Sequence, residues 1–282
     1  MFSYRSSTVL LATWLLSLAP LSAHAETVQL YLLGGQSNMV GYGLNSELPP
    51  ELQGEQTDVR FSTGGRWLNL RPGFGNTGAH FGPELTFGRH MADALPTENV
   101  ALIKYAVGGT DLANDWRPPD ANGEGAGPLY VTFMNRVGTA VNLLGPGTDW
   151  EFAGMIWMQG ERDSRDPDKA QAYEQNLTDF IASIRDDVAV PDLPFVIGRI
   201  SNTPTLPYGE IIRQAQFDVS QSVSNTAMIN TDDLPRLWDD LHYATPGVLT
   251  LGSRFGEGIL SIPEPASMIS LLCVALLARR PR

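Results

Sequence analysis

Short apolar runs of strand length alternate with segments of helical spacing from residue 27 to residue 258. The strand-like runs are apolar almost throughout, as expected for strands that helices cover on both faces of a sheet. The alternation predicts an α/β fold with a mostly parallel central sheet. The predicted strands are 27–33, 58–62 (the weakest), 100–107, 152–158, 195–200 and 227–230, and the predicted helices are 83–95, 129–144, 169–185, 211–223 and 245–258.

The sequence also predicts the start of the last helix and one long loop. Thr245 is the expected N-cap of the last helix, because threonine is a good cap and Pro246 suits the first helical position. Residues 111–127 are rich in proline, glycine and aspartate. We expect a long loop there, near the functional face, because structureless segments of this length are often functional.

The first 25 residues have the pattern of an export signal. Arg5 supplies the positive charge, residues 9–18 form an apolar run of signal-peptide length, and Ala23-His24-Ala25 provides the small residues of a cleavage site. We therefore expect the mature chain to begin at Glu26. A buried N-terminal helix is the alternative, which the flanks of the apolar run disfavour.

Residues 261–282 form a second segment with a targeting pattern. The sequence Pro263-Glu264-Pro265 is followed by the apolar stretch 268–278 and by three arginines at the end. This stretch is too short to span a bilayer comfortably, and its basic flank favours the cytoplasmic side. The arrangement resembles a PEP-CTERM sorting signal, which implies export in a Gram-negative bacterium, transient membrane association and processing by an exosortase. A C-terminal core helix is the alternative, which the arginines disfavour.

Charge and cysteine content exclude several classes of protein. The formal net charge is -12, so the chain has little attraction for a phosphate backbone, and nucleic-acid binding is not expected. Cys273 is the single cysteine, which excludes a disulfide framework and a cysteine-rich zinc site. The predicted domain, residues 26–260, keeps 15 basic and 30 acidic residues, a net charge of -15, and no cysteine. This content suits an oxidising extracytoplasmic setting.

Four predicted loops carry residues suited to chemistry. Three of them follow predicted strands, and ligands of parallel sheets bind beside the carboxyl ends of the strands. The fourth precedes the last helix. The four segments are Gly35-Gln36-Ser37-Asn38-Met39, Gly108-Gly109-Thr110, Trp157-Met158-Gln159-Gly160-Glu161-Arg162-Asp163 and Asp239-Asp240-Leu241-His242.

The first two segments each have a chemical and a structural interpretation. Ser37 presents a hydroxyl and its own N–H group to a crevice, or it caps the next helix. Gly108 and Gly109 let backbone N–H groups approach a ligand closely, or they form a plain turn.

The other two segments likewise have more than one interpretation. The side-chain amide of Gln159 suits a developing oxyanion. Glu161 and Asp163 either orient other site groups or begin the next helix, where carboxylates are favoured. Asp239 lies three residues before His242, a spacing that lets the carboxylate bond the imidazole Nδ1–H. The alternative for this segment is a solvated acidic turn with a surface histidine.

Together the four segments resemble the SGNH hydrolase superfamily and, more narrowly, the sialate O-acetylesterase and carbohydrate esterase family 6 group. The resemblance extends over residues 27–258. It implies a three-layer, flavodoxin-like α/β/α fold and the removal of O-acetyl groups from sugars. The mechanism that it implies needs no metal and no other cofactor.

The resemblance also implies roles for individual residues. Ser37 matches the nucleophile, His242 the general base, and Asp239 the carboxylate that orients His242. Gly109, or its neighbour Gly108, matches the backbone oxyanion donor, which acts with the N–H group of Ser37.

The third segment departs from the superfamily pattern, because many SGNH enzymes have an asparagine where this chain has Gln159. Either Gln159 completes the oxyanion site or Glu161 helps to orient it. The residues expected to support the site are Gln36, Asn38, Glu161 and Asp163.

Three further side chains have weaker claims. His80 lies in a glycine-rich loop and is a candidate for contact with substrate, whereas His90 fits a packed or surface position on a helix. Trp116, in the long loop, either stacks on a sugar ring or anchors the loop in the core.

The sequence thus predicts an exported serine esterase that removes O-acetyl groups from carbohydrates at the cell surface or outside the cell. The alternatives are a non-catalytic glycan-binding surface protein and a lipase or thioesterase of the same superfamily. Acetylxylan, acetylated sialic acid and acetylated exopolysaccharide all stay open as substrates. The negative net charge favours a neutral polysaccharide unless a local patch overrides it.

Overall fold

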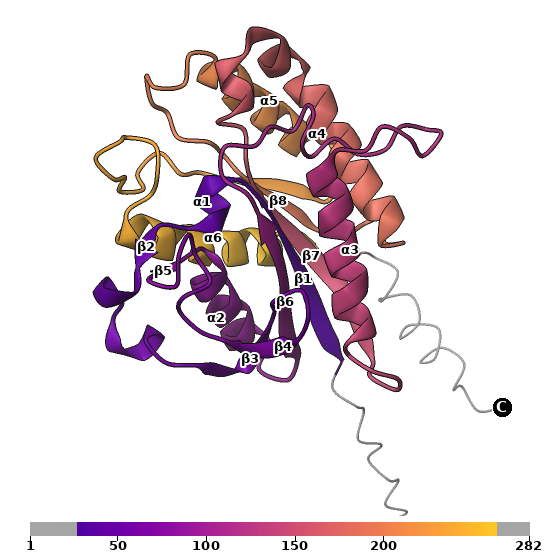
Figure 1. Cartoon of the computed structure of the whole chain (residues 1–282), viewed down its shortest axis with the longest axis vertical. Helices are drawn as coiled ribbons and strands as arrows, with labels where there is room; N and C mark the ends of the chain where they lie inside the picture. The colour runs from indigo at the N-terminus through magenta and orange to yellow at the C-terminus, as the bar shows by residue number, and fades with distance from the viewer. Residues whose placement is uncertain (1–26, 264–282) are drawn as a thin grey trace, which may run out of the picture.

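The computed structural model describes residues 27–263, which contain a seven-stranded sheet of order β4-β3-β6-β1-β7-β8-β9 (Figure 1). All neighbouring strands in it run parallel except β3 and β4, which form an antiparallel pair at one edge. The predicted export signal and nearly all of the predicted sorting tail lie outside the described residues. The strands of this sheet are β1 (Val28–Gly35), β3 (Gln56–Ser62), β4 (Trp67–Leu70), β6 (Asn99–Ala106), β7 (Trp150–Met158), β8 (Phe195–Gly198) and β9 (Thr226–Ile229).

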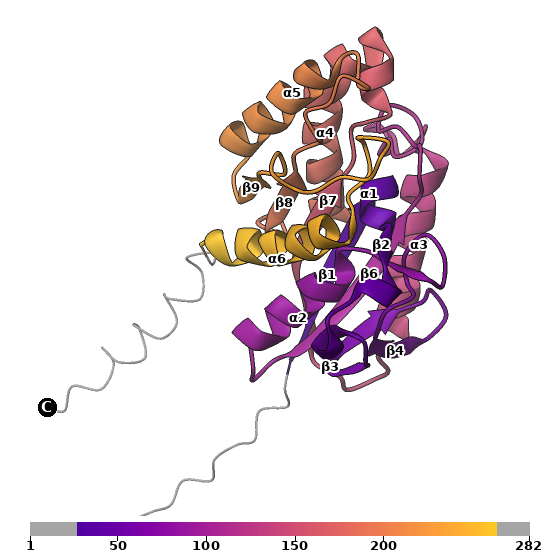
Figure 2. The same cartoon turned by 90° about the vertical axis from the view of Figure 1, so that its left-hand side faces the viewer.

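Helices cover both faces of this sheet, as Figures 1 and 2 show from two directions. On one face α2 packs against α6, and on the other lie α3 and α4, with α5 beside α4 and against β9. The predicted three-layer α/β/α fold with a mostly parallel sheet is therefore confirmed. The helices are α1 (Ser37–Val40), α2 (Glu84–Ala94), α3 (Pro128–Asn142), α4 (Pro167–Asp187), α5 (Gly209–Ser222) and α6 (Thr245–Ser261), and a separate small sheet pairs β2 (Gly43–Leu44) with β5 (His80–Phe81).

The core lies on both sides of the central strands β1 and β7. Leu30, Leu32 and Leu33 of β1 and Ile156 and Trp157 of β7 are fully buried. Each such side chain contributes about 1.5–3 kcal/mol of burial free energy, which explains why these strands are apolar along their whole length. No helix within residues 27–263 has the length and apolar character needed to cross a membrane.

The edge strand β4 was not predicted, and β3 begins at Gln56, two residues before the predicted start. Three of the four β4 residues are only half-buried, so the strand leaves no continuous apolar run in the sequence. The turn that joins β3 to β4 contains Gly64, whose φ of 86° lies in the region that favours glycine. This pair extends the sheet beyond β6.

The predicted N-cap of the last helix is wrong by one residue. Helix α6 begins at Thr245, its N-cap is Ala244, and no side chain caps it. The hydroxyl of Thr245 instead accepts the N–H of Leu44 at 2.9 Å, which ties α6 to the small sheet. A hydroxyl that bonds a backbone group so distant in the sequence gives no local signal.

Candidate active site

The four chemically equipped segments meet at one edge of the sheet. β1 pairs with β7 so that Gly35 lies opposite Met158, and it pairs with β6 so that Gly35 also lies opposite Ala106. The residues that follow these three strands are therefore neighbours. The N–H of Gln36 donates to the carbonyl of Met158 at 2.9 Å, which fixes the first turn against the end of β7.

Ser37 is placed by a sharp turn from β1 into the short helix α1. Gly35 has a φ of 146°, and a Cβ there would lie 2.1 Å from the carbonyl oxygen of Met158, so only glycine fits. Ser37 is the first residue of α1 and is 5% exposed. The N-cap is Gln36 and no side chain caps this helix, so the capping interpretation of Ser37 is wrong.

Ser37, His242 and Asp239 form a continuous chain of hydrogen bonds. The Oγ of Ser37 lies 3.0 Å from Nε2 of His242, and Nδ1 of His242 lies 2.6 Å from Oδ2 of Asp239. When Nδ1–H donates to the carboxylate, Nε2 is the ring atom that accepts a proton from Ser37. The solvated-turn interpretation of this segment is therefore wrong, because His242 contacts Ser37 and Asp239 contacts His242.

The turn itself holds the carboxylate of Asp239. Its Oδ1 accepts the N–H groups of Leu241 and His242, each at 3.0 Å. Burial raises the pKa of Asp239, but these N–H groups and the imidazole outweigh it and hold the pKa below its usual value. Asp239 is thus ionised at neutral pH and able to stabilise an imidazolium.

One face of the histidine is covered by an aromatic ring that the sequence did not indicate. The ring centres of Tyr42 and His242 are 4.4 Å apart, with the planes tilted by 36°. His80 lies next to Tyr42, with the two ring centres 6.2 Å apart. Its Nδ1 is 2.7 Å from Oγ1 of Thr77. His80 is thus near the site without joining the hydrogen-bonded chain.

Asn38 connects the serine helix to the histidine turn. Its Nδ2 donates to Oε1 of Glu161 at 2.7 Å and to the carbonyl of Leu241 at 3.3 Å, and its Oδ1 accepts the N–H of Tyr243 at 3.2 Å. Glu161 is buried, and burial raises its pKa while the Asn38 bond opposes the rise. Its Oε2 has no hydrogen-bond partner within residues 27–263. Glu161 therefore acts on the histidine turn through Asn38.

Gln159 is fully buried behind the site rather than open to it. Its Nε2 donates to Oδ2 of Asp163 at 2.6 Å and to the carbonyl of Thr110 at 3.0 Å, and lies 3.3 Å from Oε1 of Gln36. Its Oε1 accepts the hydroxyl of Tyr173 at 3.1 Å. Because both amide N–H groups are taken, the prediction of Gln159 as an oxyanion donor is corrected to a supporting role.

Asp163 and Gln36 complete this buried network. Asp163 accepts the N–H groups of Leu112 and Ala113 at 2.9 and 3.2 Å, and burial raises its pKa to about 6 although these bonds oppose the rise. It does not begin a long helix, because α4 is capped by Asp166. Oε1 of Gln36 lies within hydrogen-bond distance of the N–H groups of residues 160 and 162. The network therefore fixes the three strand ends to one another.

Three backbone N–H groups beside Ser37 are available to a ligand oxygen. A Cβ on Gly108 would lie 3.5 Å from Cβ of Ser37, so the backbone of Gly108 faces the nucleophile. Gly109 has a φ of 73°, and nothing lies within 4 Å of its Cβ position. Within residues 27–263, the N–H groups of Ser37, Gly108 and Gly109 form no hydrogen bond. Unpaired N–H groups of this kind can donate to a ligand oxygen.

The long loop after β6 is anchored by Trp116. Its side chain is fully buried, its Nε1 donates to Oγ1 of Thr110 at 3.0 Å, and its ring lies 5.2 Å from that of Trp157. The core-anchor interpretation is therefore correct, and the sugar-stacking one is wrong. The loop begins at the glycine pair and so links those N–H groups to the core.

A buried ion pair beneath α1 was also missed. Nζ of Lys104 lies 2.5 Å from Oε2 of Glu84 and donates to the carbonyl of Val40 at 2.9 Å. Burial lowers the pKa of Lys104, and the Glu84 carboxylate opposes that shift. The pair holds the last residue of the serine helix. The signal that was available is a single lysine inside the apolar run 100–107.

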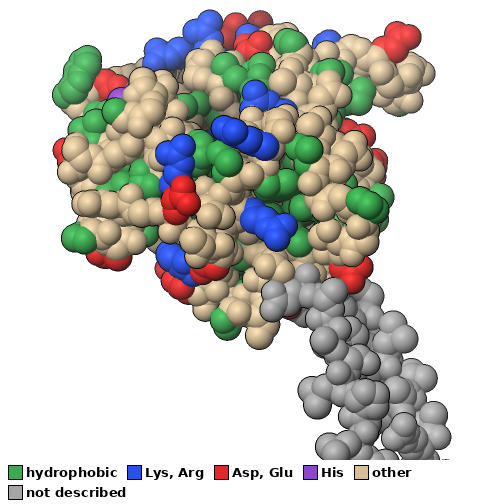
Figure 3. Space-filling view, turned by 60° about the horizontal axis from the view of Figure 1, so that its bottom comes forward, with side chains coloured by type: hydrophobic (Ala, Val, Ile, Leu, Met, Phe, Trp, Pro, Cys, Tyr) green, Lys and Arg blue, Asp and Glu red, His purple; other side chains and the backbone are tan. Residues whose placement is uncertain are grey.

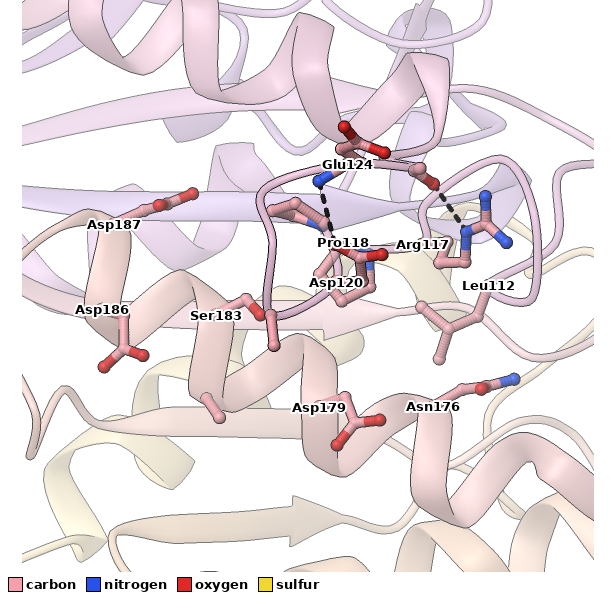
Figure 4. A pocket seen from close by; sticks show the side chains of 14 residues that line it. Leu112, Arg117, Pro118, Asp120, Glu124, Asn176, Asp179, Ser183, Asp186 and Asp187 are labelled. Atoms are coloured by element: carbon pink, nitrogen blue, oxygen red, sulfur yellow. Dashed lines mark hydrogen bonds between the residues drawn. The ribbon is translucent and has the colours of Figure 1, made fainter.

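A cleft of 720 Å³ lies between the 111–127 loop and α4, away from Ser37 (Figure 4). Carboxylates line it from both sides. No group of three or more His, Cys, Asp or Glu residues in the described part of the chain is arranged to hold a metal ion. The acidic residues of this cleft are Asp120, Glu124, Asp179, Asp186 and Asp187.

A hydrogen-bonded serine, histidine and aspartate beside the carboxyl ends of a mostly parallel α/β sheet is an arrangement that recurs among hydrolases of several α/β folds. The family model described as "Carbohydrate esterase, sialic acid-specific acetylesterase" matches residues 27–261. The chain belongs to this family of carbohydrate esterases.

Relatives and solved structures agree with this assignment. A probable carbohydrate esterase of Arabidopsis thaliana is 27% identical over 253 residues, which cover 83% of this chain and 90% of the relative. A solved Arabidopsis thaliana structure superposes with a TM-score of 0.70 at 24% identity, covering 83% of this chain and 98% of that one. The structure of a carbohydrate acetylesterase from Xanthomonas citri superposes with a TM-score of 0.61 at 18% identity, covering 82% of this chain and 55% of that one. The structure of NanS superposes with a TM-score of 0.63 at 15% identity, covering 84% of this chain and 97% of that one. At these identities the structures show a shared fold.

Proposed function

We propose that this protein is an exported serine esterase that removes O-acetyl groups from carbohydrates. Membership of the carbohydrate esterase family supports an O-acetyl esterase. The observation that carries the mechanism is the chain of 3.0 and 2.6 Å contacts from Ser37 through His242 to Asp239.

The proposed reaction is a two-step acyl transfer. His242 Nε2 takes the proton of Ser37 Oγ as the oxygen attacks the acetyl carbonyl, and Asp239 stabilises the imidazolium. His242 then gives this proton to the departing sugar oxygen. In the second step His242 activates water, which attacks the acetyl-serine, and acetate leaves as the proton returns to Ser37.

The N–H groups of Ser37, Gly108 and Gly109 are the proposed oxyanion donors. They form no hydrogen bond within residues 27–263, whereas the amide of Gln159 is fully used by Asp163 and Thr110. Removing one such donor costs about 10²–10³ in kcat. Gln159 contributes by fixing the loop that begins at the glycine pair.

Acetate release from p-nitrophenyl acetate by the purified protein, measured beside Ser37→Ala, tests this proposal. We expect the wild type to be active and the variant to lose at least 10⁴-fold in kcat. A folded wild type no more active than Ser37→Ala on this ester and on acetylated glycans would favour the glycan-binding alternative. Faster cleavage of long-chain p-nitrophenyl esters than of the acetate would favour a lipase or thioesterase.

The export part of the proposal is supported by the sequence patterns of residues 1–25 and 261–282. It implies that the processed protein is at the cell surface or outside the cell. N-terminal sequencing of the protein made in a Gram-negative host is expected to start at Glu26. An uncleaved chain confined to the cytoplasm would contradict it.

A further inference from the structure

The ion pair of Lys104 and Glu84 lies inside the molecule, between strand β6 and the first residue of α2. Lys104 is 8% exposed and Glu84 is fully buried. Lys and Arg side chains more often stand in water, as those on the face drawn in Figure 3 do. Taking two charges out of water costs about as much free energy as their attraction returns, so a buried pair is weak evidence of stability. What the pair contributes must therefore be sought in its other hydrogen bonds.

The other polar contacts of the pair all reach backbone groups. Nζ of Lys104 donates to the carbonyl of Val40 at 2.9 Å and to that of Phe74 at 3.4 Å. Together with the Glu84 carboxylate, these acceptors match the three N–H groups of an ammonium. Oε1 of Glu84 accepts the N–H of Gly82 at 2.8 Å. The pair thus joins the end of α1, the loop between β4 and β5, and the turn that precedes α2.

The segment held at Val40 carries both the serine and the ring that covers the histidine. Ser37 is the first and Val40 the last residue of the four-residue helix α1. Tyr42 follows two residues later, with its ring centre 4.4 Å from that of His242. A helix of one turn is too short to be stable by itself, so contacts with its surroundings must set its orientation. The bond from Lys104 to Val40 is one of these contacts.

The backbone of this segment is in close contact with the turn that Glu84 holds. A Cβ on Gly41 would lie 2.0 Å from Cα of Gly82, and a Cβ on Gly82 would lie 2.7 Å from Nζ of Lys104. No side chain fits between the pair and the backbone at these two positions. A displacement of the pair is therefore passed directly to residues 40–42.

We propose that Lys104 and Glu84 are a positioning pair for the esterase reaction, which holds residues 40–42 so that Ser37 and Tyr42 keep their places against His242. The inference rests on the proposed function and adds two residues that act through α1 rather than on the substrate. Apolar side chains could fill the same space, but they offer no donors to the two carbonyls and no acceptor to the N–H. A misplacement of about 1 Å can cost about 10²-fold in rate, so a small shift of α1 is measurable.

The test removes the pair and compares the result with the loss of a matched cation elsewhere. The double variant Lys104→Met/Glu84→Leu removes both charges together, so neither stays unpaired in the core. Arg185→Met is the control, because Arg185 is also buried and donates to backbone carbonyls, including those of Leu193 and Asn225. These carbonyls precede β8 and β9, at the opposite edge of the sheet from the site.

Three quantities are measured for each variant at a temperature where it is folded. They are kcat and KM for p-nitrophenyl acetate, the rate constant for labelling of Ser37 by a fluorophosphonate, and the thermal unfolding midpoint. Glu84→Gln is the conservative variant, because its amide oxygen still accepts the N–H of Gly82.

We expect the double variant to lower kcat and the labelling rate about 10- to 100-fold, with KM changed less than about threefold. Glu84→Gln should give a smaller loss, about three- to tenfold, because one of the backbone bonds remains. Arg185→Met should lower the midpoint at least as much as the double variant does and leave both rates within about twofold of the wild type, because its bonds lie far from α1.

Two results would overturn the positioning pair alone: wild-type rates in the double variant, or equal losses of rate in the double variant and in Arg185→Met, which would indicate a general effect of stability. If the double variant does not fold, wild-type rates in Glu84→Gln would overturn it. A folded wild type that neither cleaves p-nitrophenyl acetate nor reacts with the fluorophosphonate at Ser37 would overturn the proposed function and the positioning pair together.

Discussion

The turn that carries Asp239 and His242 and the segment 159–163 both serve the same serine, but they are built in opposite ways. In the turn, Asp239 accepts N–H groups from residues two and three positions on, and the side chains of Asp239 and His242 stay 27% and 19% exposed. In the second segment, Gln159 and Asp163 are fully buried. The bond from Leu112 to Asp163 joins residues 51 positions apart. The proposed reacting groups are therefore held by local bonds and are partly exposed, whereas the proposed aligning groups are buried and bond residues distant in the sequence.

This contrast separates two kinds of substitution. Changes in the turn remove chemistry from a region that contributes little buried contact, so they should alter kcat with little change in stability. Changes in segment 159–163 leave buried donors or acceptors without partners, so they should alter the free energy of unfolding first. Each prediction below tests whether this division holds.

The largest effect is expected in the turn. His242→Ala removes the general base and should lower kcat about 10⁶-fold, and Asp239→Asn, which loses the imidazolium partner, about 10⁴-fold. Steady-state hydrolysis of p-nitrophenyl acetate measures both, and the thermal midpoint of each variant should stay within about 3 °C of the wild type.

Asp240→Asn is the matched control for these two variants. Asp240 occupies the same turn, but its carboxylate bonds Arg236 and Thr203 rather than the imidazole. Its φ of 53° is one that asparagine tolerates. A loss of kcat in Asp240→Asn as large as in Asp239→Asn would show that the turn acts by its shape and not by the Asp239 contact.

In the buried segment, Asp163→Ala should lower the free energy of unfolding by about 3 kcal/mol or more. The N–H groups of Leu112 and Ala113 and the amide of Gln159 would lose their acceptor, and each buried unpaired group costs about 1–3 kcal/mol. Urea unfolding measures the change. The kcat should also fall, because the loop beginning at the glycine pair loses its attachment.

Asp166→Ala is the control, because it removes an aspartate three residues away that only caps α4. Loss of a cap costs about 1 kcal/mol and should leave kcat unchanged. If Asp163→Ala were no more destabilising than Asp166→Ala, the description of segment 159–163 as the structural half of the site would be wrong.

The same contrast explains what could be predicted from the sequence. A bond between Asp239 and His242 could be anticipated because it spans three residues, and the resemblance of the four segments to a known family implied roles for these two residues and for Ser37. The role of Gln159 could not be predicted from the sequence. Its partners Thr110 and Asp163 are brought to it by the alignment of β6, β1 and β7 and by the path of the long loop. A side-chain amide looks the same in the sequence whether it faces substrate or the core.

The sheet shows the same limit. The five strands β1, β6, β7, β8 and β9 are apolar runs with helices on both faces, and the sequence pattern located all of them. β4 lies at the edge and is half-buried, so its residues keep no strand-like pattern and the sequence did not reveal it.

A smaller effect should appear in the pH dependence of stability. The pKa of the Asp163 carboxyl is 3.8 in the unfolded chain and is raised by burial to about 6 in the folded one. The folded state therefore favours the protonated form, and the contribution of Asp163 to stability is fully present below pH 3.8 and lost as the pH rises through about 6. The loss amounts to about 3 kcal/mol.

Urea unfolding of the wild type and Asp163→Asn from pH 3.5 to pH 7 measures this contribution. The difference between their free energies of unfolding should fall by that amount between pH 4 and pH 6 and then stay constant, since other titrating groups are common to both. A difference independent of pH would mean that the three N–H donors hold Asp163 ionised and that burial does not dominate its pKa.

The smallest effect is expected at Trp238, which belongs to the histidine turn but takes no part in its bonds. Its side chain is 96% exposed, immediately before Asp239. A flat apolar ring beside the triad suits the apolar face of a sugar, and such contacts contribute about 0.5–1.5 kcal/mol. Trp238→Ala should therefore raise KM for an acetylated oligosaccharide about two- to tenfold, with kcat and the hydrolysis of p-nitrophenyl acetate unchanged.

Trp150→Ala is the control, because Trp150 is 39% exposed at the other end of the sheet, where β7 begins. Equal KM values in the two variants would confine the function of the turn to Asp239 and His242, whereas a change at Trp238 alone would make the accessible half of the site a binding surface as well as a catalytic one.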